Sequence, residues 1–333
     1  MKRVLFQTQS KEVFEAYYQD AVDSLGLGGR LYNAQIGLAL RNLYSFDFDR
    51  TTVREGVLPI YLLRFLSAGE RADFIIQDPF ITALGKRNRA GKVICMVHHI
   101  DYTLKEKSLK WKWFLNRLER RLPGLDAVVT VSHFWRQYLE NLGCRNVHVI
   151  YNSFPVEKFT VDRLALEEFK KRYEIPREKP LVYIGNARAQ KGINDVYHAL
   201  KDEGYTLVTT GPRASEIDLP ILRLSLPYAD YIKLLHACDL VLTMSTMLEG
   251  WNRTAHEAML CHTPVVGSGS GGMRELLEGG GQLICLDFMR LPELCRRALA
   301  EKKAYAQKGY AFATHFDMKY FRESWKDLLQ NMD

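Results

Sequence analysis

The sequence LVYIGNARAQKG covers residues 181–192 and decides the fold of the second half of the chain. Its first part, Leu181 to Ile184, is a short apolar run of the kind found in buried parallel strands. The rest is a loop with glycine at both ends, Gly185 and Gly192, and helical spacing of apolar residues follows over Ile193 to Leu200. The stretch predicts a strand, a glycine-bounded loop and a helix, which is one unit of a doubly wound α/β domain.

Similar short strands recur along the chain, with helical stretches between them. They are predicted at Arg3 to Thr8, Phe74 to Gln77, Val93 to Val97, Ala127 to Val131 and Val147 to Ile150, and in the second half at Leu181 to Ile184, Thr206 to Thr210, Asp239 to Thr243, Pro264 to Val266 and Leu283 to Leu286. This alternation predicts parallel sheets with helices on both faces. We therefore expect two doubly wound, Rossmann-like α/β domains.

The length of 333 residues suits about two domains. We predict an amino-terminal domain over residues 1–152, a polar connector over 153–178 and a carboxy-terminal domain over 179–305. A helical segment over 306–333 is expected to pack back on the amino-terminal domain.

The chain carries 46 Lys and Arg against 39 Asp and Glu, a formal charge of +7. This mild excess permits an anionic ligand, an anionic lipid surface or nucleic acid as a partner. The six cysteines are scattered without a C-x-x-C pair, which argues against a zinc site and a disulfide framework. Because no apolar run is long enough for a signal peptide or a membrane span, we expect a cytoplasmic protein.

Polar or glycine-rich segments follow four of the predicted strands in the second half. Besides the loop with Arg188 and Lys191, they are Gly211 to Arg213, Ser245 to Arg253 and Gly267 to Gly272. Carboxyl ends of parallel strands meet at one edge of a sheet, so these segments are expected to surround a nucleotide. Two cations beside a helix start suit a diphosphate, and the alternative is a solvated basic turn.

Two carboxylates eight positions apart, Glu249 and Glu257, flank the break Gly250-Trp251-Asn252. Ionised carboxylates accept hydrogen bonds from hydroxyl groups, so the pair can hold different parts of one ligand. A capping or dipole effect at a helix start is the alternative.

The segment Gly267 to Gly272 matches G-x-G-x-x-G and raises a nicotinamide-dependent oxidoreductase as a competing hypothesis. The match falls late in its domain rather than after the first strand. The nearest acidic residue for a ribose is Asp287, which is not clearly placed for that role.

Taken in order, several motifs resemble the retaining glycosyltransferases of family 4. They are Gly185 to Gly192, Glu249-Gly250 with Glu257-Ala258-Met259, Thr263 to Val266 and Gly271 to Glu275, with looser matches at Gly28-Gly29, His98-His99, Asp126 to Ser132 and Val149 to Asn152. The resemblance implies the GT-B fold, in which two Rossmann-like domains face each other across a cleft. It also implies a nucleotide diphosphate sugar as donor, with no cofactor and no metal ion.

The resemblance also assigns roles to individual residues. Lys191 would contact the donor diphosphate, Glu257 the ribose hydroxyls and Glu249 a hydroxyl of the transferred sugar. The full donor-binding set is Gly28, Gly29, Arg188, Lys191, Gly211, Glu249, Gly250, Trp251, Asn252, Glu257, Ser270, Gly271 and Gly272, and the catalytic set is His98, His99, Glu249 and Lys191.

His98 and His99 follow a predicted strand at the edge where ligands bind. The family places one histidine here near the transferred sugar, and His98 matches slightly better. At least one of the two is expected to be a packing or hydrogen-bonded histidine.

Two positions depart from the family pattern. Asn186 stands where the family usually has arginine, so Arg188 is the alternative source of that charge. Gly250-Trp251-Asn252 replaces the usual Gly-Phe-Gly, a bulkier turn that bears on donor preference.

Two apparent motifs are set aside. Asp47-Phe48-Asp49 has the form of a D-x-D metal motif, but we interpret it as a solvated turn that ends a helix. Gly85 to Lys92 is similar to a phosphate-binding loop but has one residue too many, and is expected to be a basic surface turn.

The segment Lys105 to Leu122, KEKSLKWKWFLNRLERRL, predicts a basic amphipathic helix. Such a helix can lie on an anionic membrane surface, or its apolar stripe can simply cover the sheet. Nucleic acid is not expected as a partner because no recognition motif accompanies the charge.

The motifs together predict a retaining glycosyltransferase that moves a hexose from a UDP- or GDP-sugar to a hydroxyl of a glycan or lipid-linked acceptor. A GT-B protein that binds a nucleotide sugar or glycan without turning it over is the alternative.

Overall fold

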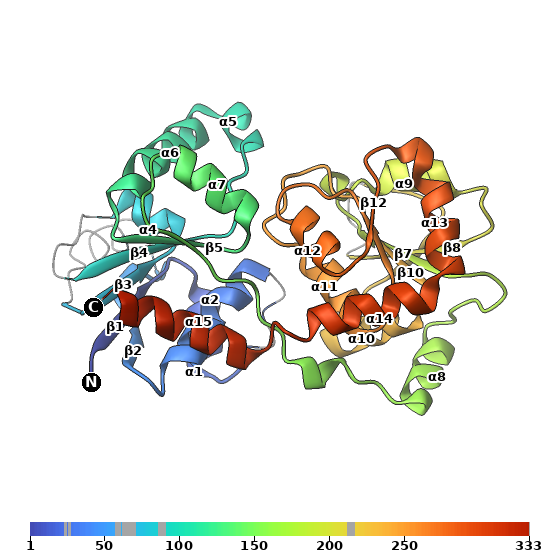
Figure 1. Ribbon diagram of the computed structural model, residues 1–333, viewed down its shortest axis with the longest axis horizontal. Helices are drawn as coiled ribbons and strands as arrows, with labels where there is room; N and C mark the ends of the chain where they lie inside the picture. Colours follow the sequence, from blue (N-terminus) through green and yellow to red (C-terminus); the bar gives the residue numbers. More distant parts are fainter. Residues whose placement is uncertain are drawn as a thin grey trace. The chain divides into compact units, whose positions relative to one another are not determined.

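The computed structural model describes residues 1–22, 25, 28–56, 61, 71–85, 91–211 and 217–332. The chain forms two compact units, Met1–Ser153 with Met318–Asp333, and Phe154–Asp317. Each unit is a parallel sheet with helices packed on it (Figure 1).

The sheet of the first unit has the strand order β2-β1-β3-β4-β5-β6, and every pairing is parallel. Its strands are β1 (Arg3–Gln7), β2 (Ser45–Phe48), β3 (Phe74–Gln77), β4 (Lys92–Val97), β5 (Ala127–Thr130) and β6 (Val147–Val149). Its helices are α1 (Lys11–Tyr18), α2 (Gly28–Leu40), α4 (Pro79–Leu84), α5 (Thr103–Lys107), α6 (Leu109–Arg121), α7 (His133–Asn141) and α15 (Met318–Asn331), with short 3-10 turns at Arg50–Thr52 and Leu122–Gly124. The central strands β3 and β5 are buried at every residue, as expected for a sheet covered on both faces.

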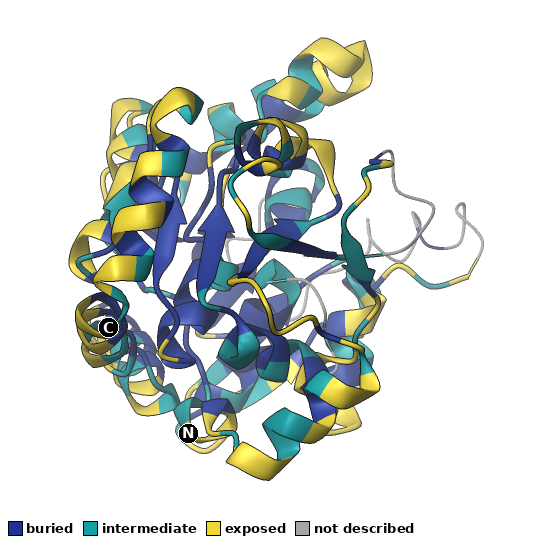
Figure 2. Cartoon of the chain, turned by 90° about the vertical axis from the view of Figure 1, so that its right-hand side faces the viewer, coloured by how far each residue is buried: buried dark blue, intermediate teal, exposed yellow. Residues whose placement is uncertain are grey.

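The sheet of the second unit has the order β12-β11-β10-β7-β8-β9, again parallel throughout. Its strands are β7 (Leu181–Asn186), β8 (Thr206–Thr210), β9 (Leu222–Leu224), β10 (Leu240–Thr243), β11 (Val265–Gly267) and β12 (Leu283–Ile284). Its helices are α8 (Arg163–Arg172), α9 (Ile193–Leu200), α10 (Tyr228–Ala237), α11 (Arg253–Leu260), α12 (Met273–Gly279), α13 (Leu291–Ala300) and α14 (Lys302–Ala313), with 3-10 turns at Val156–Phe159, Ala189–Lys191 and Phe288–Arg290. Figure 2 shows the strands buried and the outward turns of the helices exposed.

The last helix of the chain, α15, returns to the first unit and packs on α2. The rings of Tyr32 and Phe321 meet edge to face at 4.9 Å, and the hydroxyl of Tyr320 accepts the N–H of Tyr151 at 3.2 Å. Of the segment predicted to pack on the first domain, 306–333, only the part from Met318 belongs to that unit, because α14 packs on α11 of the second.

The region predicted as a connector, 153–178, is almost entirely part of the second unit. From Phe154 onward it belongs to the second unit, where α8 packs on α10. The hydroxyl of Tyr173 donates to Oδ2 of Asp230 at 2.8 Å, which ties this charged stretch to the domain.

The interpretation of Asp47-Phe48-Asp49 as a solvated turn is wrong. Asp47 and Phe48 end β2, a short edge strand whose register pairs Phe48 with Phe6. Asp49 is only 2% exposed, and its carboxylate accepts Nε2 of Gln7 at 2.8 Å and the N–H of Thr51 at 3.0 Å. The aspartate is thus a buried cap rather than a metal ligand. The alternating pattern of β2 lacks the apolar run by which the other strands were found.

Three further expectations concern the cysteines, membrane spans and the turn Gly85 to Lys92. All six cysteines are free and buried. Within the described ranges, no helix is long and apolar enough to cross a membrane. The turn Gly85 to Lys92 lies mostly outside the described residues, since 86–90 are not included.

Candidate active site

The strand order of the second unit fixes where a ligand can bind. Counting from β7, the order is 3-2-1-4-5-6, with the reversal between β7 and β10. In open parallel sheets the ligand crevice lies outside the carboxyl ends of the strands at such a reversal. The loops that leave β7 and β10 carry Lys191 and Glu249, so both residues start from the expected edge.

The loop after β7 is held against the loop after β10 by a single carbonyl. The oxygen of Gln190 accepts the N–H of Thr246 at 3.0 Å and the hydroxyl of Ser245 at 3.2 Å. Gly192 caps α9 at φ 69°, and a Cβ there would meet the carbonyl oxygen of Met244 at 2.2 Å. Glycine is required because the two loops touch through their backbones.

An ion pair joins the same two loops. Nζ of Lys191 lies 2.5 Å from Oε1 of Glu249, and Nδ2 of Asn252 is 3.5 Å from the same oxygen. The lysine side chain is 27% exposed and the glutamate 11%. Both groups therefore stay within reach of a ligand while each holds the other in place.

The loop after β11 completes the arrangement. Glu249 and Gly271 form a parallel backbone bridge, with the N–H of Gly272 donating to the oxygen of Glu249 at 2.9 Å. Gly271 has φ +63°, and a Cβ would meet the Glu249 oxygen at 2.5 Å. The predicted donor-binding residues Glu249, Gly271 and Gly272 are thus brought together with Lys191 in this unit.

Glu257 lies on α11 and is more deeply buried than Glu249. It is 5% exposed, and its Oε1 accepts the hydroxyl of Tyr228 at 3.0 Å and Nη2 of Arg253 at 3.3 Å. Burial raises the pKa of Glu257, while the Arg253 charge and the Tyr228 hydroxyl lower it. Tyr228 is a site residue that the sequence did not reveal, because its contact with Glu257 comes from packing of α10 on α11. Arg253 lies four positions before Glu257 on the same helix.

Trp251 is buried inside the second unit. It is 3% exposed, and its Nε1 donates to Nδ1 of His256 at 3.1 Å. His256 is fully buried, stacks on Phe154 at 3.9 Å, and has Nε2 3.1 Å from the oxygen of Ala313. The indole of Trp251, at the position where the family usually has Phe, is therefore held inside the unit by this hydrogen bond.

The ring of His256 is neutral with a defined tautomer. Burial lowers the pKa of His256 to about 3. Because Nδ1 accepts from Trp251, the hydrogen sits on Nε2 and is donated to Ala313.

Three other residues that the sequence analysis considered in the second unit are Arg188, Asn186 and Gly211. Arg188 is exposed, and its side chain pairs with no other described residue. Asn186 ends β7, and its Oδ1 is buried without a partner among the described residues. Gly211 follows β8 with φ +121°, and residues 212–216 lie outside the described part of the chain.

In the first unit, His98 follows β4 and packs on the start of α2. Its Nε2 is 3.1 Å from Oδ1 of Asn33, its ring meets Tyr32 edge to face, and a Cβ on Gly29 would come within 3.2 Å of its Cδ2. Burial lowers the pKa of His98 to about 3, and the charge of neighbouring His99 acts in the same direction. Nε2 of His98 thus pairs with Asn33 inside the first unit, and His99 is exposed.

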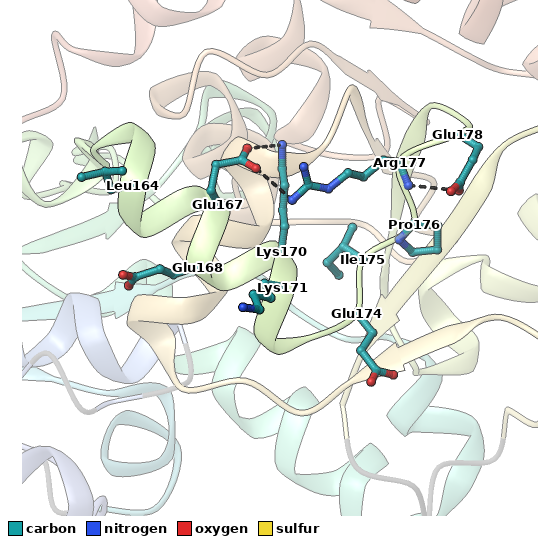
Figure 3. Close-up of a pocket in the computed structure, with 10 residues that line it drawn as sticks. All are labelled: Leu164, Glu167, Glu168, Lys170, Lys171, Glu174, Ile175, Pro176, Arg177 and Glu178. Atoms are coloured by element: carbon teal, nitrogen blue, oxygen red, sulfur yellow. Dashed lines mark hydrogen bonds and ion pairs between the residues drawn. The ribbon is translucent and has the colours of Figure 1, made fainter.

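A surface groove of about 620 Å³ lies elsewhere, along α8 and the segment after it (Figure 3). Glu167 pairs there with Arg177 at 2.9 Å and with Lys170 at 3.5 Å. The segment runs on into the amino end of β7, the edge opposite to the candidate site. The groove therefore does not belong to the site at the carboxyl ends.

Metal ligands are not clustered at these strand ends. In the described ranges, no three His, Cys, Asp or Glu side chains are grouped so that they could hold a metal ion. The glycine-rich segment Gly267 to Gly272 follows β11 rather than β7, so it does not occupy the place of a dinucleotide fingerprint.

Solved structures of other proteins share the fold of this chain. HepE from Anabaena, solved with UDP-glucose, aligns with a TM-score of 0.71 at 18% identity over 98% of this chain and 99% of its own. Sucrose-phosphate synthase from Thermosynechococcus elongatus aligns at 0.77 with 15% identity over 100% and 99%. At such identities the likeness shows the fold, GT-B.

Among curated proteins, N-acetyl-alpha-D-glucosaminyl L-malate synthase of Bacillus anthracis is 27% identical over 209 residues. The match spans 57% of this chain and about half, 52%, of that relative.

Two family models match consecutive parts of the chain. Residues 26–158 match Glycosyltransferase Family 4, and residues 166–305 match Glycosyl transferases group 1. With these matches over most of its length, and with its two Rossmann-like units, the chain belongs to the family 4 glycosyltransferases.

Proposed function

We propose that the chain is a retaining, metal-independent hexosyltransferase. It moves a hexose from a UDP- or GDP-sugar to a hydroxyl of a glycan or lipid-linked acceptor. The observation that supports this best is the Lys191 to Glu249 pair, set between backbone-linked loops at the strand reversal of the second sheet. HepE, solved with UDP-glucose and with UDP, makes a UDP-sugar the first donor to test.

The donor diphosphate would lie beside the loop after β7. Lys191 supplies one cation, exposed Arg188 a second, and the start of α9 adds free N–H groups and its positive dipole end. A diphosphate would compete with Glu249 for the Lys191 ammonium. Glu249, once relieved of that pairing, can accept hydrogen bonds from a sugar hydroxyl.

The nucleoside would extend toward α11. Glu257 is held by Tyr228 and Arg253, so its carboxylate is fixed for ribose hydroxyls. Burial that raises its pKa also strengthens a hydrogen bond from a neutral hydroxyl, because water competes less.

The chemistry follows from retention of the anomeric configuration. The acceptor hydroxyl attacks the anomeric carbon on the face from which the diphosphate leaves, the bond from that carbon to the diphosphate oxygen breaks, and the hydroxyl proton passes to a phosphate oxygen. Lys191 and the α9 N–H groups stabilise the negative charge that grows on the leaving diphosphate. No protein base is needed in this scheme.

Neutral His98 fits the scheme as a hydrogen-bonding group. With its pKa held at about 3, its imidazole is uncharged at neutral pH and is a weak base. It would therefore add little as a proton acceptor.

The test is a donor screen with the full chain. Binding of UDP-, GDP- and ADP-sugars is measured by calorimetry, and release of nucleoside diphosphate is followed with and without hydroxyl acceptors. Product from the active donor is examined by NMR for its anomeric configuration. Inversion would contradict retention, donor binding without single-turnover product would support a non-catalytic binder, and binding of NADH alone would support the oxidoreductase.

A further inference from the structure

Eight consecutive residues around the start of α6, Glu106 to Trp113, are exposed. The last seven read Lys107-Ser108-Leu109-Lys110-Trp111-Lys112-Trp113 and are here called the KW patch. Leu109 is 84% exposed, Trp113 56% and Trp111 43%. Helix α6 lies with α5 in the outer layer of the first unit (Figure 1). Large apolar side chains gathered this way in water mark a surface that binds something.

The rest of α6 is occupied by the fold. Leu115 and Leu118 are buried, and Lys105 is paired with Glu119 at 2.9 Å. Nε of Arg117 donates to the carbonyl oxygen of Ala83 at 2.6 Å, and Nη1 of Arg121 donates to the carbonyl oxygen of Thr82 at 2.9 Å. Both guanidinium groups therefore satisfy carbonyl oxygens at the end of α4. The single helix predicted over Lys105 to Leu122 is wrong, because extended Ser108 separates α5 from α6. The surface left for a partner is also much smaller than that predicted helix.

The KW patch is positively charged and amphipathic. Lys107, Lys110 and Lys112 are exposed and make no ion pair with another described residue, and Glu106 is the neighbouring exposed acid. Leu109 and Trp113 are four positions apart, so they share one face of the helix, with a lysine on either side. The amino end of the helix, capped by Ser108, adds its positive dipole end.

We propose that the KW patch binds the surface of an anionic lipid bilayer. Tryptophan is suited to the headgroup level because its ring is apolar and its N–H is polar, and Leu109 can enter the acyl boundary. The lysines meet lipid phosphates, whose attraction for cations falls off within a Debye length. An acidic protein would also suit the lysines, but an exposed leucine with two tryptophans favours the lipid.

The test uses the full chain without donor or acceptor, so it does not depend on the proposed transfer reaction. Sedimentation with vesicles of phosphatidylcholine alone is compared with vesicles that also contain phosphatidylglycerol. We expect binding to the anionic vesicles alone, a blue shift of tryptophan emission on binding, and loss of binding at high salt.

Two paired variants identify the surface. Lys110→Glu with Lys112→Glu is expected to weaken vesicle binding roughly tenfold or more, and Leu109→Ala with Trp113→Ala to remove it. The matched control, Leu164→Ala with Lys171→Glu, makes the same kinds of change at exposed positions of α8 and should bind as the unchanged chain does. Melting temperatures should stay constant because all these side chains are exposed.

Each other outcome overturns the proposal. Equal binding by the Lys110→Glu, Lys112→Glu variant would place the lipid elsewhere. A second outcome is that the chain binds no vesicles and forms a dimer, which the Leu109→Ala, Trp113→Ala variant dissociates. The partner of the KW patch would then be a second copy of the chain.

Discussion

Nζ of Lys191 and Oε1 of Glu249 lie 2.5 Å apart although the residues are 58 positions apart in the sequence. The pair joins the loops that leave β7 and β10, the two strands between which the order of the sheet reverses. In the proposed function, a diphosphate at this edge competes with the Glu249 carboxylate for the Lys191 ammonium. Substitution of Lys191 and substitution of Glu249 should therefore have different effects on the binding of nucleotide and of sugar.

Lys191→Met and Glu249→Gln are expected to act in opposite directions on UDP. Loss of a charge-assisted contact in Lys191→Met should weaken UDP about 10- to 100-fold. Glu249→Gln removes the competing carboxylate, so UDP should bind as well or better while transfer of the sugar falls. Calorimetry with UDP, alongside exposed Lys201→Met as control, checks this, and equal losses in both site variants would refute the assigned roles.

Gly271→Ala is expected to destabilise the protein more than Gly204→Ala. Both glycines have positive φ, +63° and +77°, which costs an alanine about 1–2 kcal/mol. At Gly204 nothing lies within 4 Å of the added carbon, whereas at Gly271 it would meet the Glu249 oxygen at 2.5 Å. Denaturant unfolding measures the difference, and equal costs would show that the loops are not in contact through Gly271.

Trp251→Phe should cost about 1–3 kcal/mol of unfolding free energy, because it leaves Nδ1 of buried His256 without its donor. Exposed Trp113→Phe serves as the matched control and should change stability by less than about 0.5 kcal/mol. A Trp251→Phe variant as stable as the control would mean that the indole hydrogen bond does not hold the loop.

His256 should make stability depend on pH in the acid range. Its pKa is about 3 when folded and about 6.5 when unfolded, so the unfolded chain binds more protons between these values. The contribution of His256 to the free energy of unfolding is therefore fully present above pH 6.5. It is lost as pH falls below that value, by up to about 1.4 kcal/mol per pH unit.

His256→Asn removes the titration while keeping an acceptor near Trp251. The stability advantage of the unchanged chain over His256→Asn should shrink between pH 7 and pH 4.5. A constant difference across that range would contradict a neutral, buried His256.

Chelation is expected to leave transfer unchanged. Lys191, Arg188 and the α9 N–H groups carry the leaving-group charge in the proposed mechanism, so EDTA should not alter the rate. A loss restored by added Mg²⁺ or Mn²⁺ would assign part of that charge to a metal ion.

Much of the fold follows from apolar runs. The strands β3 and β8 and the helix α9 have the predicted bounds, because each is a short buried run or a clear helical pattern between turn residues. The edge strands β2 and β9 were not predicted, since Ser45–Phe48 alternates and Leu222–Leu224 is interrupted by an arginine.

The sequence predicted those residues of the candidate site whose backbone conformation or charge depends on the residue type alone. Gly192, Gly271, Lys191 and Glu249 are of this kind. The fixing of Glu257 by Tyr228, 29 positions away, depends on how α10 packs on α11, and no local pattern encodes it. The direction of Trp251 was missed for the same reason, because its partner His256 is buried against Phe154.

The most direct test of the account is a transfer assay with the preferred donor in the unchanged chain, Lys191→Met and Lys201→Met. We expect release of nucleoside diphosphate with a glycoside of retained configuration in the unchanged chain and in Lys201→Met, and nearly complete loss in folded Lys191→Met. Wild-type turnover in Lys191→Met, or no binding and no product with any UDP-, GDP- or ADP-sugar, would contradict it.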